Sequence, residues 1–460
     1  MKDTIAAIST PPGESGLGIV RVSGPAALKI VATIFKPKKE KILAEMPSYS
    51  AHYGFVIDPA SGETIDEVIV TFMKAPATYT REDVVEINCH GGLISVRRTL
   101  ELLLKYKARL AEPGEFTKRA FLNGRIDLAQ AEAVFDIIKA KTEESLKAAV
   151  LQLKGGLSEK MNEVAETLKN TCVKVEANIE FAEEENETTD MAGIKKDLLK
   201  VLKTLRDLLA TAEGGIILRE GIKTSIIGKP NAGKSSLLNE LLNEERAIVT
   251  HIPGTTRDII EETINIGGIA FVLSDTAGIR EAKDLVEKKG IDRSLRSLAE
   301  ADLLLVVFDG ARELEKEDIE IIKITRAKNI IAVINKTDLQ PAKTTEKQLR
   351  KLLKNKTLVK ISLVNKSGME KLKKEMGKVA LKKGAGSKES IIITNVRHKE
   401  LLSSAAASLK KAVKSIEEKM SEEFVALDIR GALDYIGCIT GRVSAEDILN
   451  KIFSDFCIGK

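Results

Sequence analysis

Residues 228–235 read Gly-Lys-Pro-Asn-Ala-Gly-Lys-Ser and fit the pattern G-x-x-x-x-G-K-[ST]. An apolar run at 224–227 precedes this stretch, and a helix-like pattern at 236–242 follows it. A strand, a glycine-rich loop and a helix in that order form a phosphate-binding loop, in which backbone N–H groups surround the phosphates. Lys234 then contacts the β- and γ-phosphates, and the hydroxyl of Ser235 can bind Mg²⁺. The stretch therefore predicts a nucleotide-binding domain of the P-loop class.

Three further motifs occur in the order expected of a guanine-nucleotide site. Residues 275–278 (Asp-Thr-Ala-Gly) end an apolar strand and place a carboxylate near Mg²⁺ and a glycine amide near the γ-phosphate. Residues 335–338 (Asn-Lys-Thr-Asp) end another strand, where Asp338 can accept hydrogen bonds from N1–H and N2–H of guanine. Adenine lacks this pair of donors, so the motif selects the base. Thr256, upstream of both motifs, can complete the Mg²⁺ coordination, and all four motifs together predict GTP binding.

These motifs resemble those of the translation-factor-related (TRAFAC) GTPases, with one departure. Many such GTPases carry Gln directly after the D-x-x-G motif to orient the attacking water, but this sequence has Ile279 there. Hydrolysis must therefore use other groups. The candidates are a monovalent cation in place of an arginine finger, with Asn231 as one ligand, and a carboxylate. Glu281, Asp284 and Glu287 all remain open for that carboxylate.

The composition is that of a globular protein. The chain has 460 residues, 43% of them hydrophobic, which suggests two to four domains and excludes a mainly disordered chain. No apolar run reaches the ~20 residues of a membrane helix, and the first residues lack a secretory pattern. The four cysteines lie far apart, with no C-x-x-C pair, so neither a disulfide framework nor a structural zinc site is expected. We expect a cytoplasmic protein.

Positive charge is concentrated in one segment. The net charge is +5, but residues 341–388 hold 15 Lys or Arg against three Glu, which leaves the rest of the chain at about −7. A solvated helix surface and a contact with a polyanion both explain such a segment. We favour the solvated surface, because the lysines are spread over several expected elements.

Changes of pattern along the chain predict a multidomain α/β protein. Residues 1–118 mix short β-like runs with a helix and predict an α+β domain, and residues 119–218 predict helices. Residues 219–384 alternate short apolar runs with helical patterns, as in a Ras-like parallel sheet covered by helices. Helical periodicity returns from 395 to 456, so residues 385–460 are expected to complete an all-α domain into which the GTPase domain is inserted. Two local expectations are a helix over 94–110 and helix breaks at 155–156 and 214–215.

The flanking regions carry motifs that a GTPase domain does not need. They are RVSGP at 21–25, YTREDVVE at 79–86, CHGG at 89–92, AEPGEFTKRAFLNGR at 111–125 and FCIGK at 456–460. Together with the inserted GTPase motifs, they resemble the MnmE (TrmE) family of tRNA-modification GTPases across essentially the whole chain. The resemblance implies an N-terminal domain similar to folate-binding aminomethyltransferases.

The same resemblance assigns a folate site. It implies a tetrahydrofolate derivative, 5-formyl- or 5,10-methylene-tetrahydrofolate, in contact with Arg21, Glu82, Arg125 and Lys460. A pterin offers amide and amino donors to a carboxylate, and its glutamate tail offers carboxylates to Arg or Lys. From the residues alone, a surface or interdomain ion pair is the preferred interpretation of Glu82 and Arg125, and only the resemblance favours folate. Cys457 is a candidate nucleophile or an ordinary cysteine, and a thiolate role needs positive charge nearby, which Lys460 supplies.

For hydrolysis, the family pattern implies K⁺ bound by Asn231, Thr250, Ile252 and Thr255, and Mg²⁺ bound by Ser235 and Thr256. K⁺ next to the phosphates neutralises developing charge as an arginine finger does. The resemblance also selects Glu287 as the carboxylate that orients water. The implied GTP-binding residues are Asn231, Ala232, Gly233, Lys234, Ser235, Ser236, Thr250, His251, Ile252, Pro253, Gly254, Thr255, Thr256, Asp275, Thr276, Ala277, Gly278, Asn335, Lys336 and Asp338.

The resemblance implies a homodimer that dimerises through its N-terminal domains and whose GTPase domains face each other. With FAD-dependent MnmG, in a heterotetrameric complex, it would modify C5 of the wobble uridine of certain tRNAs with an aminomethyl or carboxymethylaminomethyl group. No membrane contact is expected. Two alternatives stay open: a ribosome-assembly or RNA-associated GTPase, which the basic segment mildly favours, and a stand-alone folate aminomethyltransferase with a regulatory GTPase domain.

Overall fold

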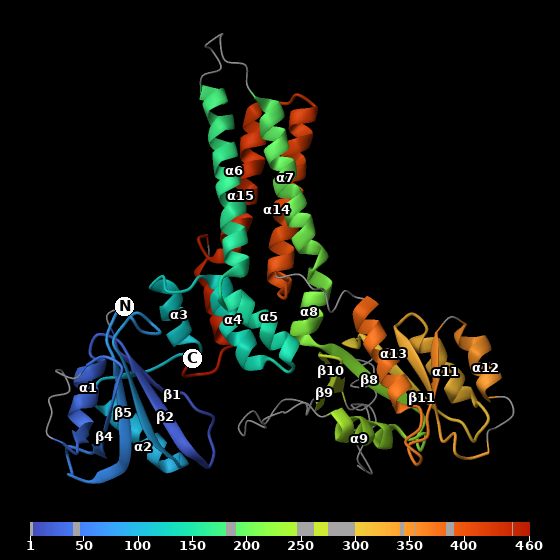
Figure 1. Cartoon of the computed structure of the whole chain (residues 1–460), viewed down its shortest axis with the longest axis horizontal. Coiled ribbons are helices and arrows are strands. Elements are labelled where there is room, and N and C mark those ends of the chain that lie inside the picture. Colours follow the sequence, from blue (N-terminus) through green and yellow to red (C-terminus); the bar gives the residue numbers. More distant parts are fainter. Residues whose placement is uncertain are drawn as a thin grey trace.

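The computed structural model consists of two sheet-containing parts joined by a helical part (Figure 1). It describes residues 3–39, 47–180, 190–245, 262–274, 300–340, 345–354, 356–382, 391–443 and 445–460. Within these residues, no helix is long and apolar enough to cross a membrane. The multidomain α/β fold class predicted from the sequence is confirmed.

The N-terminal part is a seven-stranded sheet in the order β3-β4-β5-β6-β2-β1-β7. Its strands are β1 (Ile5–Ile8), β2 (Ser15–Ser23), β3 (Phe35–Pro37), β4 (Ser50–Ile57), β5 (Thr64–Met73), β6 (Val84–Gly91) and β7 (Arg109–Leu110). Val68, Val70 and Phe72 alternate with more exposed residues along β5, because successive side chains of a strand point to opposite faces. The buried face packs against α1 (Ala27–Ile34) and α2 (Leu93–Lys105).

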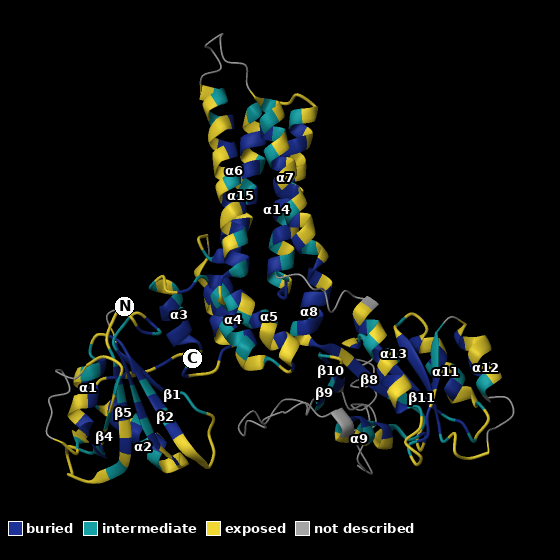
Figure 2. Ribbon diagram, viewed as in Figure 1, coloured by how far each residue is buried: buried dark blue, intermediate teal, exposed yellow. Residues whose placement is uncertain are grey.

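The helical part is built from both sides of the second sheet in the sequence. Before that sheet come α3 (Glu115–Leu122), α4 (Leu128–Lys139), α5 (Glu143–Leu153), α6 (Gly156–Glu180), α7 (Met191–Ala210) and α8 (Ala212–Glu220). After it come α14 (Val396–Glu417), α15 (Glu422–Thr440) and α16 (Glu446–Ser454). The long helices α6, α7, α14 and α15 lie side by side and bury one continuous apolar core, with exposed residues on the outside (Figure 2).

The second sheet has the order β13-β12-β11-β8-β10-β9, and only β9 runs antiparallel to its neighbour. Its strands are β8 (Ile222–Gly228), β9 (Glu262–Ile266), β10 (Ile269–Ser274), β11 (Leu303–Asp309), β12 (Ile330–Asn335) and β13 (Thr357–Lys360). The helices around it are α9 (Lys234–Glu245), α11 (Lys316–Thr325), α12 (Thr345–Leu353) and α13 (Met369–Lys382). Side chains of β11 alternate between two apolar cores, so both faces are covered, as in parallel sheets generally.

Two local expectations were wrong. The helix expected over 94–110 ends at Lys105, because Lys107 adopts a φ of +79° and residues 109–110 pair with β1 as strand β7. The glycines at 214–215 do not break a helix but lie inside α8. A Cβ on Gly215 would lie 2.2 Å from the carbonyl oxygen of Ile393, so this glycine permits close packing of α8 on the segment 391–395. The break at 155–156 is confirmed between α5 and α6.

Candidate functional site

The phosphate-binding motif forms a tight turn between β8 and α9. Gly228 has a φ of +152° and Gly233 a φ of +99°, and Asn231 adopts a left-handed φ of +61°. A Cβ on Gly228 would lie 2.3 Å from the carbonyl oxygen of Val307, and one on Gly233 would lie 2.1 Å from Nδ2 of Asn335. Only glycine satisfies both constraints, so the loop shape follows directly from the motif.

Both lysine side chains of this loop have partners, one within the loop and one on a neighbouring helix. Nζ of Lys234 donates to the carbonyl oxygen of Lys229 at 2.8 Å, and burial lowers the pKa of Lys234. Nζ of Lys229 contacts Glu315, with Asp318 at 3.7 Å, at the start of α11. Ser235 and Ser236 occupy the first turn of α9, where backbone N–H groups and the helix dipole favour anions.

The base-binding motif is anchored at the end of β12. Nδ2 of Asn335 donates to the carbonyl oxygen of Ala232 at 3.0 Å, which joins this motif to the phosphate loop. Oδ1 of Asn335 is buried and has no hydrogen-bond partner in the described part of the chain. Lys336 reaches Asp309 at 2.7 Å, and the hydroxyl of Ser362 donates to Asp338 at 2.5 Å.

More than half of the predicted nucleotide site lies outside the described residues. These predictions are Thr250, His251, Ile252, Pro253, Gly254, Thr255, Thr256, Asp275, Thr276, Ala277, Gly278 and Glu287. The structure brings together Asn231, Ala232, Gly233, Lys234, Ser235 and Ser236 with Asn335, Lys336 and Asp338. Among described residues, no group of three or more His, Cys, Asp or Glu could hold a metal ion.

A second cluster forms where the last residues of the chain dock on the N-terminal sheet. Ile458 pairs with Pro113 in an antiparallel bridge, and the N–H of Phe116 donates to the carbonyl oxygen of Lys460 at 3.2 Å. The carbonyl oxygen of Gly459 accepts from Ser9 Oγ and from Arg21 Nη1, both at 3.2 Å. The C-terminal tail, residues 456–460, therefore lies against β1, β2 and the start of α3.

Cationic side chains gather around this tail. Arg21 pairs with Glu86 at 2.8 Å and lies over Phe116, and the guanidinium of Arg125 lies 4.5 Å from the ring centroid of Tyr79. Arg21 is also 6.0 Å from the Tyr79 ring, so this tyrosine links two of the residues predicted to bind folate. Burial, and then Arg21, lower the pKa of Lys460. Cys457 is exposed beside this group.

Glu82 occupies the buried side of the same cluster. It accepts hydrogen bonds from Ser23 and from Arg119, a fully buried arginine of α3. The structure thus brings Arg21, Glu82, Arg125 and Lys460 to one region. Sequence reasoning missed Tyr79, Ser23 and Arg119. Arg119 lies inside the motif at 111–125, where its i,i+4 spacing from Glu115 is a visible signal, but nothing in the motif shows that this arginine also meets Glu82.

A buried charge network centred on α4 ties together α8 and α14, the helices on either side of the second sheet in the sequence. Asp136 accepts from Arg219 of α8 at 2.7 Å, and burial raises the pKa of Asp136 despite this pairing. One turn away, Glu132 accepts from Arg397 and His398 of α14, each at 2.7 Å. His398 and Arg397 lower the pKa of Glu132 to about 2, against the effect of burial. Sequence periodicity gave no sign of this network.

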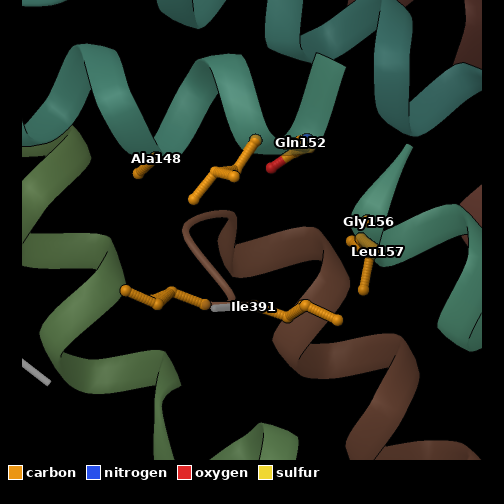
Figure 3. Close-up of a pocket in the computed structure, with 7 residues that line it drawn as sticks. Ala148, Gln152, Gly156, Leu157 and Ile391 are labelled. Carbon is orange, nitrogen blue, oxygen red and sulfur yellow. The ribbon is translucent and has the colours of Figure 1, made fainter. Parts of the chain in front are cut away.

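A small apolar pocket of about 50 Å³ lies nearby, between α5, the start of α6 and the segment that follows the second sheet (Figure 3). Its lining includes Leu157 and Ile391, and its volume is far below the ~300 Å³ of a small-molecule site. The amide of Gln152 is already bonded to Ala129 and Thr394. The pocket is therefore a packing gap between these helices and residues 391–392 and is too small for a cofactor.

Comparison with known proteins accounts for the whole chain. The model described as "GTP-binding protein TrmE N-terminus" matches residues 4–125, and the model described as "MnmE helical domain" matches residues 128–457. The tRNA modification GTPase MnmE of Thermoanaerobacter pseudethanolicus is 51% identical over 458 residues, which covers 100% of this chain and 99% of that protein. The protein of the same name from Alkaliphilus oremlandii is 49% identical over 458 residues, with the same coverage.

The chain belongs to the MnmE (TrmE) family. Its match to the MnmE helical domain spans the nucleotide site, while the TrmE N-terminal match ends at Arg125, between α3 and α4. A solved structure of Era from Aquifex aeolicus, bound to GDP·AlF4⁻, is 29% identical and covers 41% of this chain and 66% of that chain, with a TM-score of 0.29.

Proposed function

We propose that this member of the MnmE family is a GTP-hydrolysing tRNA modification enzyme. With FAD-dependent MnmG, it installs an aminomethyl or carboxymethylaminomethyl group at C5 of the wobble uridine. The observation that carries this proposal is the end-to-end similarity, at 51% identity, to a relative named tRNA modification GTPase MnmE. The nucleotide site and the cluster at the C-terminal tail support it, because each fits one of the two small molecules that the reaction requires.

The phosphate loop fits GTP with Mg²⁺. Its glycines stand where a Cβ would collide with Val307 and Asn335, and Oδ1 of Asn335 is a buried acceptor without a partner among the described residues. Lys234 contacts the negatively charged phosphates, and Asp338 accepts hydrogen bonds from the N1–H and N2–H groups of guanine. Ser235 and Thr256 are the Mg²⁺ ligands in this proposal, with Asp275 near the ion. Bound Mg²⁺ supplies charge neutralisation at the phosphates.

GTP hydrolysis is proposed to depend on K⁺ and Glu287. Asn231, in its left-handed conformation, offers a side-chain oxygen at the phosphate loop, and Thr250, Ile252 and Thr255 are the other proposed K⁺ ligands. Glu287 orients the attacking water, since Ile279 has no group that can do so. The Glu287→Ala variant is expected to keep its GTP affinity and to lose hydrolysis by orders of magnitude. Weak GTP binding by the folded variant would remove this assignment.

The tail cluster fits a tetrahydrofolate derivative. Arg21, Arg125 and Lys460 present positive charge to a glutamate tail, and Glu82 presents a fixed carboxylate to the amide and amino edge of a pterin. The folate supplies the one-carbon unit when bound. Exposed Cys457 lies within this region and is the proposed nucleophile, with Lys460 supplying nearby positive charge.

GTP hydrolysis is proposed to move the GTPase domain relative to the folate site. Both connections to that domain bond to buried carboxylates of α4: α8 through Arg219 to Asp136, and the segment 391–395 through Asn395 to Glu132. The other side of α4 contacts the tail, since the rings of Phe135 and Phe456 lie 5.0 Å apart. A shift of the GTPase domain therefore reaches the folate site through one short helix.

A homodimer is the proposed functional form, in complex with MnmG and tRNA in the cytoplasm. Tyr53 and Ile69 are neighbours across β4 and β5 and are 41% and 47% exposed. Apolar side chains this exposed on the N-terminal sheet are consistent with dimerisation through that domain.

The first experiment is nucleoside mass spectrometry on tRNA from cells that lack the gene. Complementation with the wild type is expected to restore the C5-modified wobble uridine, and complementation with Cys457→Ser is expected to fail. Restoration by both would keep the function and remove the cysteine from the chemistry. An unchanged tRNA profile would reject the modification role and favour ribosome assembly.

A further inference from the structure

Arg119 is a completely buried arginine that contacts three carboxylate residues from three separate segments. Nη2 lies 2.9 Å from Oδ1 of Asp3 and 2.9 Å from Oε1 of Glu115, and Nη1 lies 3.1 Å from Oε2 of Glu82. Its side chain is 0% exposed, so it makes no contact with solvent and cannot bind a ligand directly. Its role must therefore be exerted through the groups that it holds.

The guanidinium of Arg119 is fully used. Nε donates to Glu115 at 3.3 Å, Nη2 is shared between Asp3 and Glu115, and Nη1 is shared between the carbonyl oxygen of Asp3 and both oxygens of Glu82. A guanidinium has five N–H donors in a fixed plane, whereas an ammonium group has three on a flexible stem. Lysine at this position can keep the charge but cannot reproduce the arrangement.

Glu82 is held from a second direction. The hydroxyl of Ser23, at the end of β2, donates to Oε2 of Glu82 at 2.8 Å and lies 2.7 Å from the hydroxyl of Thr80. The Glu82 side chain is only 12% exposed. Arg119 and Ser23 therefore fix both the position and the rotation of this carboxylate, part of which remains exposed.

A pterin donates two N–H groups in parallel from its amide and amino edge. A carboxylate accepts both only when it is ionised and coplanar with that edge, as in other paired hydrogen bonds to carboxylates. A free glutamate on a loop would lose rotational entropy on binding, whereas one that is already fixed does not. Fixing Glu82 in advance thus increases affinity for the pterin specifically.

We propose that Arg119, assisted by Ser23, is a positioning residue that presents Glu82 to the pterin edge of the folate. This inference rests on the proposed folate function. Arg109 serves as a matched control, because its ion pairs within the described residues are with Asp3 and Glu115 of the same cluster and not with Glu82.

The test is a double-mutant cycle on the full-length chain, with 5-formyltetrahydrofolate binding measured by calorimetry. Glu82→Gln and Arg119→Met are each expected to weaken binding about 30-fold, and Arg119→Lys about 5-fold, as for loss of charged hydrogen bonds. In the Glu82→Gln background, Arg119→Met is expected to add less than about 2-fold, because its effect passes through Glu82. Arg109→Met is expected to stay within about 2-fold of the wild type.

The outcomes separate the inference from the function on which it rests. A wild-type chain that does not bind 5-formyltetrahydrofolate refutes the folate function, and the inference with it. The wild type can bind 5-formyltetrahydrofolate while the affinity losses of Glu82→Gln and Arg119→Met multiply in the double variant. That result refutes the positioning role alone and leaves the folate function intact. If Arg119→Met does not fold, Ser23→Ala takes its place in the cycle. Ser23→Ala is expected to weaken 5-formyltetrahydrofolate binding about 5-fold in the wild type and to have no effect in the Glu82→Gln background. An unchanged affinity of Ser23→Ala for the folate overturns the proposal.

Discussion

The nucleotide site and the tail cluster, which is proposed to bind folate, are built in opposite ways. Eight consecutive residues, 228–235, form the phosphate loop, and its shape depends on glycines that tolerate a positive φ. The tail cluster instead joins the first strands of the chain to its last residues, as in the hydrogen bond from Arg21 to Gly459, 438 positions apart. Short motifs can encode the first kind of site, but only the complete fold creates the second.

Exchange of the base-recognising carboxylate should have the largest effect and should be confined to one site. Asp338→Asn loses two charge-assisted hydrogen bonds to guanine, so GTP affinity is expected to fall about 1,000-fold, or about 4 kcal/mol. The new amide can donate to the second carbonyl of xanthine, so XTP affinity should rise. Competition with a fluorescent GDP analogue measures both. Folate binding serves as the control, and a parallel loss there would show that the two sites are not separately built.

The buried charge network on α4 should have the largest effect on stability. Glu132→Gln leaves Arg397 and His398 without their buried carboxylate, and unfolding free energy is expected to fall by about 3 kcal/mol. Because the pKa of Glu132 is lowered to about 2, its stabilisation is present above about pH 4.5 and is lost as pH falls towards 2.

Urea unfolding at pH 7, 5 and 3.5 tests this pH dependence. The difference between the wild type and the variant should be largest at pH 7 and should shrink at pH 3.5. Glu400→Gln, an exposed change on the same helix α14, is the control and should have almost no effect. A difference that grows on acidification would contradict the assigned direction of the pKa shift.

The contrast between the two sites also explains what the sequence could predict. Strand, loop and helix around residues 228–235 follow from local chemistry, and so does the alternation of β11 between two cores. The partners of Arg119 follow only in part: Glu115 lies four residues earlier on the same helix, but Asp3 and Glu82 come from segments that are adjacent to Arg119 only after folding. Gly215 was misread for the same reason, since its role is to let Ile393 approach. Family resemblance supplied the residues proposed to bind folate, but not the side chains that hold them.

Attachment of the tail can be broken by a single methyl group. Gly459 has a φ of +94°, and a Cβ there would lie 2.3 Å from the carbonyl oxygen of Ile8. Gly459→Ala is therefore expected to weaken 5-formyltetrahydrofolate binding about 20-fold and to leave GTP affinity unchanged. Gly377→Ala, where a Cβ meets nothing within 4 Å, is the matched control. Equal folate binding by both variants would mean that the docked tail is not part of the folate site.

The smallest expected effect comes from Ser362, and it tests whether residues close together in sequence are enough to build the nucleotide site. Asp338 is held by the hydroxyl of Ser362, a buried residue 24 positions further along the chain, which also accepts from the N–H of Asn365. Ser362→Ala removes one hydrogen bond to the carboxylate, so GTP affinity is expected to fall about 5-fold, or about 1 kcal/mol. Ser367→Ala is the control, because Ser367 bonds to Ser362 through its backbone, which the substitution retains. A loss as large as that of Asp338→Asn would mean that even the base-binding motif depends on a distant residue for its function, and the contrast between the two sites would then be one of degree.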